Sequence, residues 1–338
     1  YDPALAAAVG AFQRRHGLAA DGIIGPQTLA ALNVPADQRA LQVTLNLERW
    51  RWLPREPGPR HLLVNIPDFS LALVEDGVPT LTMRAVVGRP DRPTPVVSGL
   101  MQWLVINPGW SVPQKLARED LLPKLAADPG YLLDRGFRVY ADWRPGAAEI
   151  DPAGVDWRAI DPLHLGFKFF QAPGPRNPLG RVKFMFPNDF SVYIHDTDQR
   201  GVFAQDQRCF SAGCVRIEAP DDLLQRLALR GNAPAEAAVQ TAMAGNKSVG
   251  LALAEALPVH LVYLTAWVET DGTLQFRRDC YGYDGDLAAA LVAGARAPVA
   301  PHRPLPPAVI ARAAAPAPTA AHQVRTGPVS MWTKREAE

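Results

Sequence analysis

The chain has 338 residues, which is enough for about two domains and a sizeable core. Its 35 basic and 34 acidic residues leave a formal net charge of +1, so bulk electrostatics give no case for nucleic acid or a charged membrane surface as a partner. No apolar run is long enough to span a bilayer, and 3 cysteines do not make a disulfide framework.

Residues 1–34 predict a small module of two helices. Apolar positions fall at helical spacing from Leu5 onward, Gly17 ends that helix, and Pro26 suits the first turn of a second helix. The module resembles the C-terminal part of a type 1 peptidoglycan-binding domain whose first helix is cut short. The alternative is a helical pair that only packs on the next domain. The resemblance is carried by Phe12-Gln13, Gly17-Leu18, Asp21-Gly22 and Gly25-Pro26-x-Thr28-Leu29.

The rest of the chain predicts an α+β protein. Residues 35–60 continue as a helix and linker, where Trp50 and Trp52 are expected to anchor the modules by packing. Short strands joined by Gly and Pro turns then predict a mainly antiparallel, β-sandwich-like domain over 61–285. A helical and mixed insertion interrupts it at about 107–175, and 286–338 is expected to hold a terminal helix and a mobile Pro/Ala-rich tail.

Individual elements can be placed within these bounds. Alternating apolar residues bounded by turn residues indicate strands, and the last two strands are expected to form a hairpin about Asp271-Gly272. The expected strands are 62–66, 70–74, 80–87, 100–106, 184–187, 190–194, 215–217, 259–267 and 273–277, and the expected later helices are 114–127, 219–229, 234–244 and 286–295.

The strongest chemical signal lies between Tyr193 and Arg216. The strand ending at residue 194 delivers His195, and Cys214 follows a glycine ahead of another short strand. A thiol needs a proton acceptor to become a reactive thiolate, which an imidazole supplies. Gly213 permits a tight turn, and the backbone N–H groups of Gly213 and Cys214 are expected to face a developing oxyanion.

The residues around this pair resemble the catalytic signature of the L,D-transpeptidases of bacterial peptidoglycan, the YkuD-type catalytic domain. The signature stands here as His195 followed by Ser211-Ala212-Gly213-Cys214-Val215-Arg216, and the segment from Gln171 to Phe184 also follows the family pattern. Many relatives have a second histidine at the position of Ala212, so no role is carried over for it. The Val-Arg ending is similar to the large Gram-negative, YcbB-like branch, in which a capping subdomain overhangs the catalytic cleft.

The resemblance implies a function and a set of roles. The donor would be a tetrapeptide stem, cleaved before its terminal D-Ala through a thioester on Cys214, and an amine of a neighbouring stem would complete a 3→3 cross-link. His195 would act as base and acid, Gly213 would hold the oxyanion, and Ser211 would orient the loop. Carbapenems would acylate the nucleophile, no cofactor or metal is implied, and the compartment would be the periplasm.

Substrate contacts and other activities remain open at this stage. Arg216 suits a substrate carboxylate or a turn carbonyl, and Tyr193 lies on the strand face of His195, where it either lines the cleft or packs in the core. Trp110 either lines the substrate channel beneath the insertion or anchors its loop. The alternative functions are an L,D-carboxypeptidase or endopeptidase that uses water, and a weakly active wall-binding scaffold.

The cysteines allow two further interpretations. His195, Asp196, Asp198 and Cys214 make a conceivable zinc set, although the usual ligand spacings are missing. Alternatively, Cys209 bridges Cys214, permanently or as a reversible bridge that silences the nucleophile. Cys280 is interpreted as a plain buried thiol.

Overall fold

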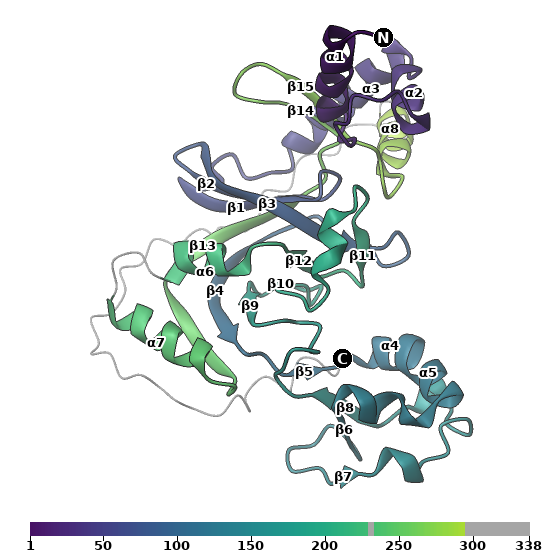
Figure 1. Ribbon diagram of the computed structural model, residues 1–338, viewed down its shortest axis with the longest axis vertical. Coiled ribbons are helices and arrows are strands. Elements are labelled where there is room, and N and C mark those ends of the chain that lie inside the picture. Colours follow the sequence, from purple (N-terminus) through teal and green to yellow (C-terminus); the bar gives the residue numbers. More distant parts are fainter. Residues whose placement is uncertain (229–232, 295–338) are drawn as a thin grey trace.

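A computed structural model describes residues 1–228 and 233–294 of the chain (Figure 1). The N-terminal helices lie at one end of its long axis, a large sheet occupies the middle, and a smaller mixed region lies at the other end. No helix in these two ranges is both long and apolar enough to cross a membrane. The N-terminal helices are α1 (Pro3–Arg15), α2 (Pro26–Leu32) and α3 (Ala36–Trp50).

Both predicted N-terminal helices are confirmed, and a buried glutamine joins them. The Asp2 side chain caps α1 by accepting the Leu5 N–H at 2.8 Å. The amide of Gln13 donates to Asp21 at 2.8 Å and to the Thr28 hydroxyl at 3.1 Å. Because Gln13 is only 1% exposed, these hydrogen bonds satisfy a polar group that would otherwise be costly to bury.

Helix α3 is attached to the next domain by polar residues rather than by its tryptophans. Asn46 donates to the Thr265 hydroxyl at 2.8 Å, and the guanidinium of Arg49 pairs with Asp284 at 2.5 Å. Trp50 and Trp52 are 48% and 54% exposed, so the prediction that they anchor the modules is wrong. The buried face of α3 carries Asn46 and Arg49, whereas Trp50 at its end and Trp52 just beyond it are exposed to solvent.

The central sheet has nine strands in the order β11-β3-β12-β10-β9-β4-β13-β1-β2, and a further pairing of β2 with β3 closes it on itself. Most neighbours are antiparallel, as predicted, while β1–β13, β10–β12 and β3–β11 are parallel. The strands are β1 (Arg60–Asn65), β2 (Ser70–Glu75), β3 (Val78–Gly88), β4 (Val97–Ile106), β9 (Val182–Met185), β10 (Ile194–His195), β11 (Cys209–Ser211), β12 (Val215–Ile217) and β13 (Val249–Val262).

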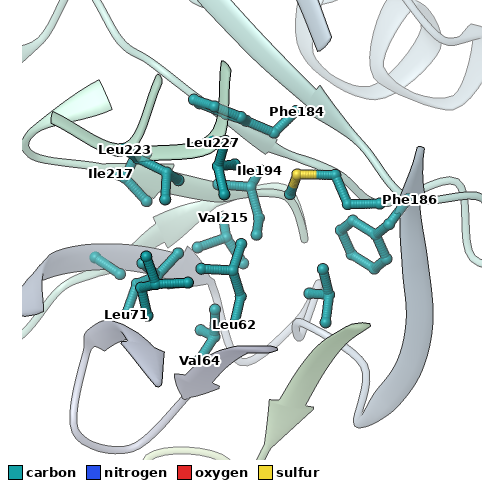
Figure 2. Close-up of a cluster of buried hydrophobic side chains, with 14 of the residues drawn as sticks. Leu62, Val64, Leu71, Phe184, Phe186, Ile194, Val215, Ile217, Leu223 and Leu227 are labelled. Carbon is teal, nitrogen blue, oxygen red and sulfur yellow. The ribbon is translucent and has the colours of Figure 1, made fainter. Parts of the chain in front are cut away.

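One face of this sheet forms the main core. Figure 2 shows side chains of β1 and β2, such as Leu62, meeting those of β9, β10 and β12, such as Ile194 and Val215. These three side chains are fully buried, and burying a side chain of this size stabilises the fold by about 1.5–3 kcal/mol. Leu223 and Leu227 of helix α6 join the same cluster (Figure 2). The later helices are α6 (Pro220–Ala228), α7 (Ala233–Ala244) and α8 (Tyr283–Gly294).

The predicted insertion has a core and a sheet of its own, and we keep the name capping region for residues 107–175. Its four strands pair in the order β5-β8-β6-β7, and Trp157 and Phe169 are among its buried residues. The helix expected over 114–127 is present but contains a π-helical turn, η1. Its elements are β5 (Trp110–Ser111), α4 (Gln114–Leu116), η1 (Ala117–Leu121), α5 (Leu122–Ala127), the 3₁₀ helices η2 (Pro129–Arg135), η3 (Pro152–Gly154) and η4 (Pro162–His164), β6 (Phe137–Tyr140), β7 (Glu149–Ile150) and β8 (Lys168–Gln171).

Two strand predictions need correction. The strand expected over 190–194 is reduced to Ile194–His195, because the Asn188 side chain bonds the backbone of residues 186, 190 and 192 and holds them in a turn. Val259 belongs to the long strand β13, so the hairpin consists only of β14 (Ala266–Val268) and β15 (Leu274–Phe276). The predicted tail after 294 lies outside the described residues.

Candidate active site

Three adjacent strands and the residues directly before two of them bring five side chains together at the central sheet. His195 of β10 lies across from Lys183 of β9 and from Arg216 of β12. The neighbouring positions, Phe184, Ile194 and Val215, are in register with each other and point into the core. Because side chains alternate along strands, the residues next to these positions point the opposite way. We call the surface that they form the site face. It comprises Lys183, Tyr193, His195, Cys214 and Arg216.

Ring contacts support this placement. The rings of Tyr193 and His195 have centroids 5.5 Å apart, and the ammonium of Lys183 lies 3.8 Å from the centroid of the Tyr193 ring. A cation at that distance over an aromatic face is attracted to it. The Lys183–Tyr193–His195 row therefore brings one positive charge, that of Lys183, to the site face.

His195 is held in one tautomer. Its Nδ1 lies 2.5 Å from the carbonyl oxygen of Asp196, and a carbonyl can only accept, so Nδ1 carries the proton and Nε2 keeps a lone pair. Burial lowers the pKa of His195 to about 3, helped by the charges of Arg216 and Lys183 and opposed by the bond to Asp196. The imidazole is therefore neutral at neutral pH and presents Nε2 as a base.

Cys214 is a half-buried free thiol. Burial raises its pKa above the ordinary value, while hydrogen bonding to Tyr193 and the charges of Lys183 and Arg216 act in the opposite direction. Cys214 and His195 thus rest as a neutral thiol and a neutral imidazole rather than as an ion pair.

The loop before Cys214 is closed by Ser211. The hydroxyl of Ser211 donates to the Cys214 carbonyl oxygen at 2.5 Å and accepts the Gly213 N–H at 3.1 Å. Gly213 has φ +118°, a conformation that favours glycine. The Gly213 N–H, expected to face an oxyanion, is already occupied in this conformation, whereas Ser211 does hold the loop.

A threonine supports the same loop from the other side. Thr94 donates its hydroxyl to the Gly213 carbonyl oxygen at 2.8 Å and accepts the Gly88 N–H at 2.8 Å. Tyr281 in turn donates to the Gly88 carbonyl oxygen at 2.7 Å and accepts the Thr94 N–H at 3.2 Å. These contacts connect the residue before Cys214 to the segment that precedes α8.

Asp196 fixes the end of the strand that carries His195. Its buried carboxylate accepts the Arg181 N–H at 2.7 Å, the Thr197 N–H at 2.6 Å and a guanidinium N–H of Arg200 at 2.5 Å. Burial raises the pKa of Asp196, although these hydrogen bonds and the Arg200 charge oppose the rise. A side chain on Gly180 would place its Cβ 2.2 Å from this carboxylate, so the glycine leaves room for it.

Arg216 has an unused donor. Its Nη1 donates to Gln199 at 3.2 Å, while the buried Nε makes no hydrogen bond within residues 1–228 and 233–294. Because buried polar groups are almost always paired, this unpaired guanidinium N–H two residues after Cys214 is an exception in the site.

Comparison with known proteins decides the family. The profile of the L,D-transpeptidase catalytic domain, YkuD, matches residues 59–242, which is more than half of the chain. The chain belongs to the L,D-transpeptidase family. A peptidoglycan-binding domain profile matches residues 1–32 of this L,D-transpeptidase, in agreement with the predicted module.

Individual relatives are similar over part of their length. A Haemophilus influenzae protein provisionally named an L,D-transpeptidase is 35% identical over 249 residues, covering 74% of this chain and 49% of its own. The chain thus spans about half the length of this curated relative. A solved L,D-transpeptidase from Mycobacterium smegmatis has TM-score 0.28 at 13% identity, covering 60% of this chain and 58% of its own. A solved L,D-transpeptidase from Xylanimonas cellulosilytica has a TM-score of 0.28 at 16% identity, covering 76% of this chain and 79% of its own.

Trp110 is not brought to the site face of this L,D-transpeptidase. It is half-buried on β5, packs on the core of the capping region, and makes an edge contact with Phe137 at 5.9 Å between ring centroids. These contacts favour the interpretation that Trp110 anchors its loop by packing. The capping region instead contacts the segment between β3 and β4, where Arg92 pairs with Glu119 and Asp120 of η1 at 2.6 Å each.

Sequence reasoning missed two residues near the nucleophile. Lys183 is part of the Lys-Phe pair that ends the family-like segment, and Thr94 lies between β3 and β4; the sequence analysis assigned no role to either residue. The zinc set does not form, since no group of three metal-binding side chains occurs in the part of the chain that the structure describes. The bridge between Cys209 and Cys214 is not formed either; the thiol next to Cys209 is Cys280.

Proposed function

We propose that the protein is a periplasmic cysteine transpeptidase that joins peptidoglycan stem peptides by 3→3 cross-links. Membership of the L,D-transpeptidase family and the peptidoglycan-binding module support this class of substrate. The observation that carries the proposal is the composition of the site face, where a thiol, an unprotonated imidazole nitrogen and an unpartnered guanidinium N–H lie on adjacent strands.

The reaction would proceed in two acyl transfers. Nε2 of His195 takes the proton of Cys214 as the sulfur attacks the carbonyl carbon before the terminal D-Ala of a tetrapeptide stem. The same nitrogen then protonates the departing amine, so that D-Ala leaves and a thioester remains on Cys214. The amine of a second stem attacks the thioester, gives up a proton to His195, and regenerates the thiol.

Electrostatics give Arg216 and Lys183 a role in this sequence. Their positive charges lower the pKa of His195, which makes the imidazole a weak base in the free protein. A substrate carboxylate bound to the free N–H of Arg216 would offset that charge and raise the basicity of His195 where the proton is transferred. Substrate binding would therefore prepare the base, and the Lys183 charge would still favour the thiolate.

The test is mass spectrometry of the protein mixed with a carbapenem, with Cys214→Ala as the matched variant. The expected result is one covalent adduct on the wild type, located on Cys214 and absent from the variant. An unmodified wild type under reducing conditions would contradict an activated thiol and favour a wall-binding scaffold.

Transfer and hydrolysis are separated by a second assay. A tetrapeptide stem is supplied with and without an acceptor stem, and the products are resolved by chromatography and mass. The proposal expects cross-linked dimer whose yield rises with acceptor concentration. Tripeptide alone, at every acceptor concentration, would identify an L,D-carboxypeptidase instead.

A further inference from the structure

Cys209 and Cys280 lie against each other, although they are far apart in the sequence. Cys209 begins β11, just before Ser211, and Cys280 lies between β15 and α8. Each thiol shifts the pKa of the other, and both side chains line one cavity. Both are half-buried against the main core, and the Tyr263 hydroxyl lies 3.7 Å from the sulfur of Cys280.

A cavity gives reagents access to this pair. Its volume is about 560 Å³, and both cysteines line it together with Phe210, Arg278 and Gln27. The neighbouring Cys280 thiol, with help from the charge of Arg278, lowers the pKa of Cys209. The Cys209 thiol and burial raise the pKa of Cys280, so Cys280 keeps its proton and Cys209 is the more nucleophilic sulfur.

We propose that Cys209 and Cys280 form a reversible disulfide by exchange with an external disulfide such as oxidised glutathione. The Cys209 thiolate attacks one sulfur of that reagent, forming a mixed disulfide and releasing one thiol. Cys280 then loses its proton and displaces the second thiol, which closes the Cys209–Cys280 bond. The two cysteines together give up two electrons and two protons, which reduce the external disulfide to two thiols.

The bond would join covalently two segments that support the loop before Cys214. Cys209 precedes the Ser211–Cys214 turn, and Tyr281, next to Cys280, binds Gly88 and Thr94. These two segments are joined only by non-covalent contacts in the reduced protein. Oxidation would tie them together and leave Cys214 as the remaining thiol, so the nucleophile stays available while its surroundings become more stable.

The experiment uses the full-length chain, reduced, desalted, and then incubated with oxidised glutathione before alkylation. Intact mass should show three alkylated thiols before oxidation and one after it. Peptide mapping is done in Cys214→Ala, because the tryptic peptide 209–216 otherwise contains two cysteines. The expected product is peptide 209–216 joined to peptide 279–296, which dithiothreitol separates.

Single variants test the order of the steps. Cys280→Ser should stop at a stable glutathione adduct on Cys209, whereas Cys209→Ser should form neither an adduct on Cys280 at a comparable rate nor the cross-link. The oxidised wild type should melt about 5 °C or more above the reduced form, and both variants should lose that shift.

Three outcomes would overturn the inference. The first is a wild type in which all three thiols stay open to alkylation after oxidation. The second is a wild type that ends as glutathione adducts without a cross-link, which would show that the two sulfurs cannot meet. The third is a cross-linked protein with an unchanged melting temperature, which would refute the fastening role.

Discussion

Thr94 donates its hydroxyl to the carbonyl oxygen of Gly213 at 2.8 Å, and Gly213 directly precedes Cys214. The same hydroxyl accepts the Gly88 N–H, so one small side chain joins the end of β3 to the catalytic loop. Thr94 is fully buried, which keeps both hydrogen bonds away from competing water.

Thr94→Val should therefore damage the loop without changing the volume of the core. Each buried partner left unsatisfied costs about 1–3 kcal/mol, so the melting temperature should fall by a few degrees and carbapenem acylation of Cys214 should slow by about tenfold or more. Acylation is followed by mass spectrometry and unfolding by calorimetry. Thr94→Ser keeps the hydroxyl and should acylate at nearly the wild-type rate; an equally slow Ser variant would refute the hydrogen-bond argument.

The reactivity of Cys214 should rise steeply with pH. Burial raises its pKa above the ordinary value and His195 stays neutral, so no thiolate–imidazolium pair supplies thiolate at low pH. The rate of alkylation by iodoacetamide should increase by about tenfold per pH unit from about pH 6 to about pH 8. The Cys209→Ser/Cys280→Ser double variant leaves Cys214 as the sole thiol for this measurement, and a plateau across that range would indicate an ion pair.

Lys183→Met should shift the titration of both catalytic partners in the same direction. The charge of Lys183 lowers the pKa of His195 and that of Cys214, so its removal raises both. The pH profile of Cys214 alkylation should move to higher pH, and the ring protons of His195 should titrate at higher pH by NMR. Lys168→Met, which removes a lysine of the capping region, is the control and should move neither profile.

Arg216→Lys should weaken substrate binding more than it lowers the rate at which bound substrate reacts. A lysine keeps the charge but loses the planar fork whose free Nε we assign to a substrate carboxylate. We expect KM for the tetrapeptide to rise about tenfold, with a smaller change in kcat. Arg84→Lys, in an exposed ion pair with Glu218, is the matched control, and equal KM values for both variants would exclude the carboxylate role.

Gly180→Ala should destabilise the protein more than a glycine replacement at an open turn. Both Gly180 (φ +60°) and Gly77 (φ +79°) favour glycine, and that conformational cost is about 1–2 kcal/mol for alanine. Only at Gly180 would the new Cβ also collide with Asp196, at 2.2 Å, which adds about 1–3 kcal/mol. Denaturant unfolding of both variants measures the difference, and equal losses would show that Asp196 simply moves aside.

The sequence predicted the residues of the candidate site better than it predicted the residues that surround them. The placement of Tyr193 and His195 on one face follows from strand alternation, and the turn at Gly213 follows from glycine. Lys183 lies at the site because β9 pairs with β10 in the register that places it opposite His195. No local sequence pattern predicts that register. Cys280 comes close to Cys209 through the folding of segments far apart in the sequence, so the sequence offered only Cys214 as an alternative partner for Cys209.

The closed sheet has a consequence for how the protein is made. β1 pairs with β13 in register from Leu62↔Val259 to Asn65↔Val262. The first strand of the sheet can therefore complete its pairing only after one of the last strands has been synthesised. During synthesis, β1 and β2 have to persist with an unpaired edge until almost the whole catalytic domain is available. An open edge of this kind is a template for pairing with another chain, so the interval before β13 arrives is when the nascent protein is most prone to aggregate and would gain most from a chaperone.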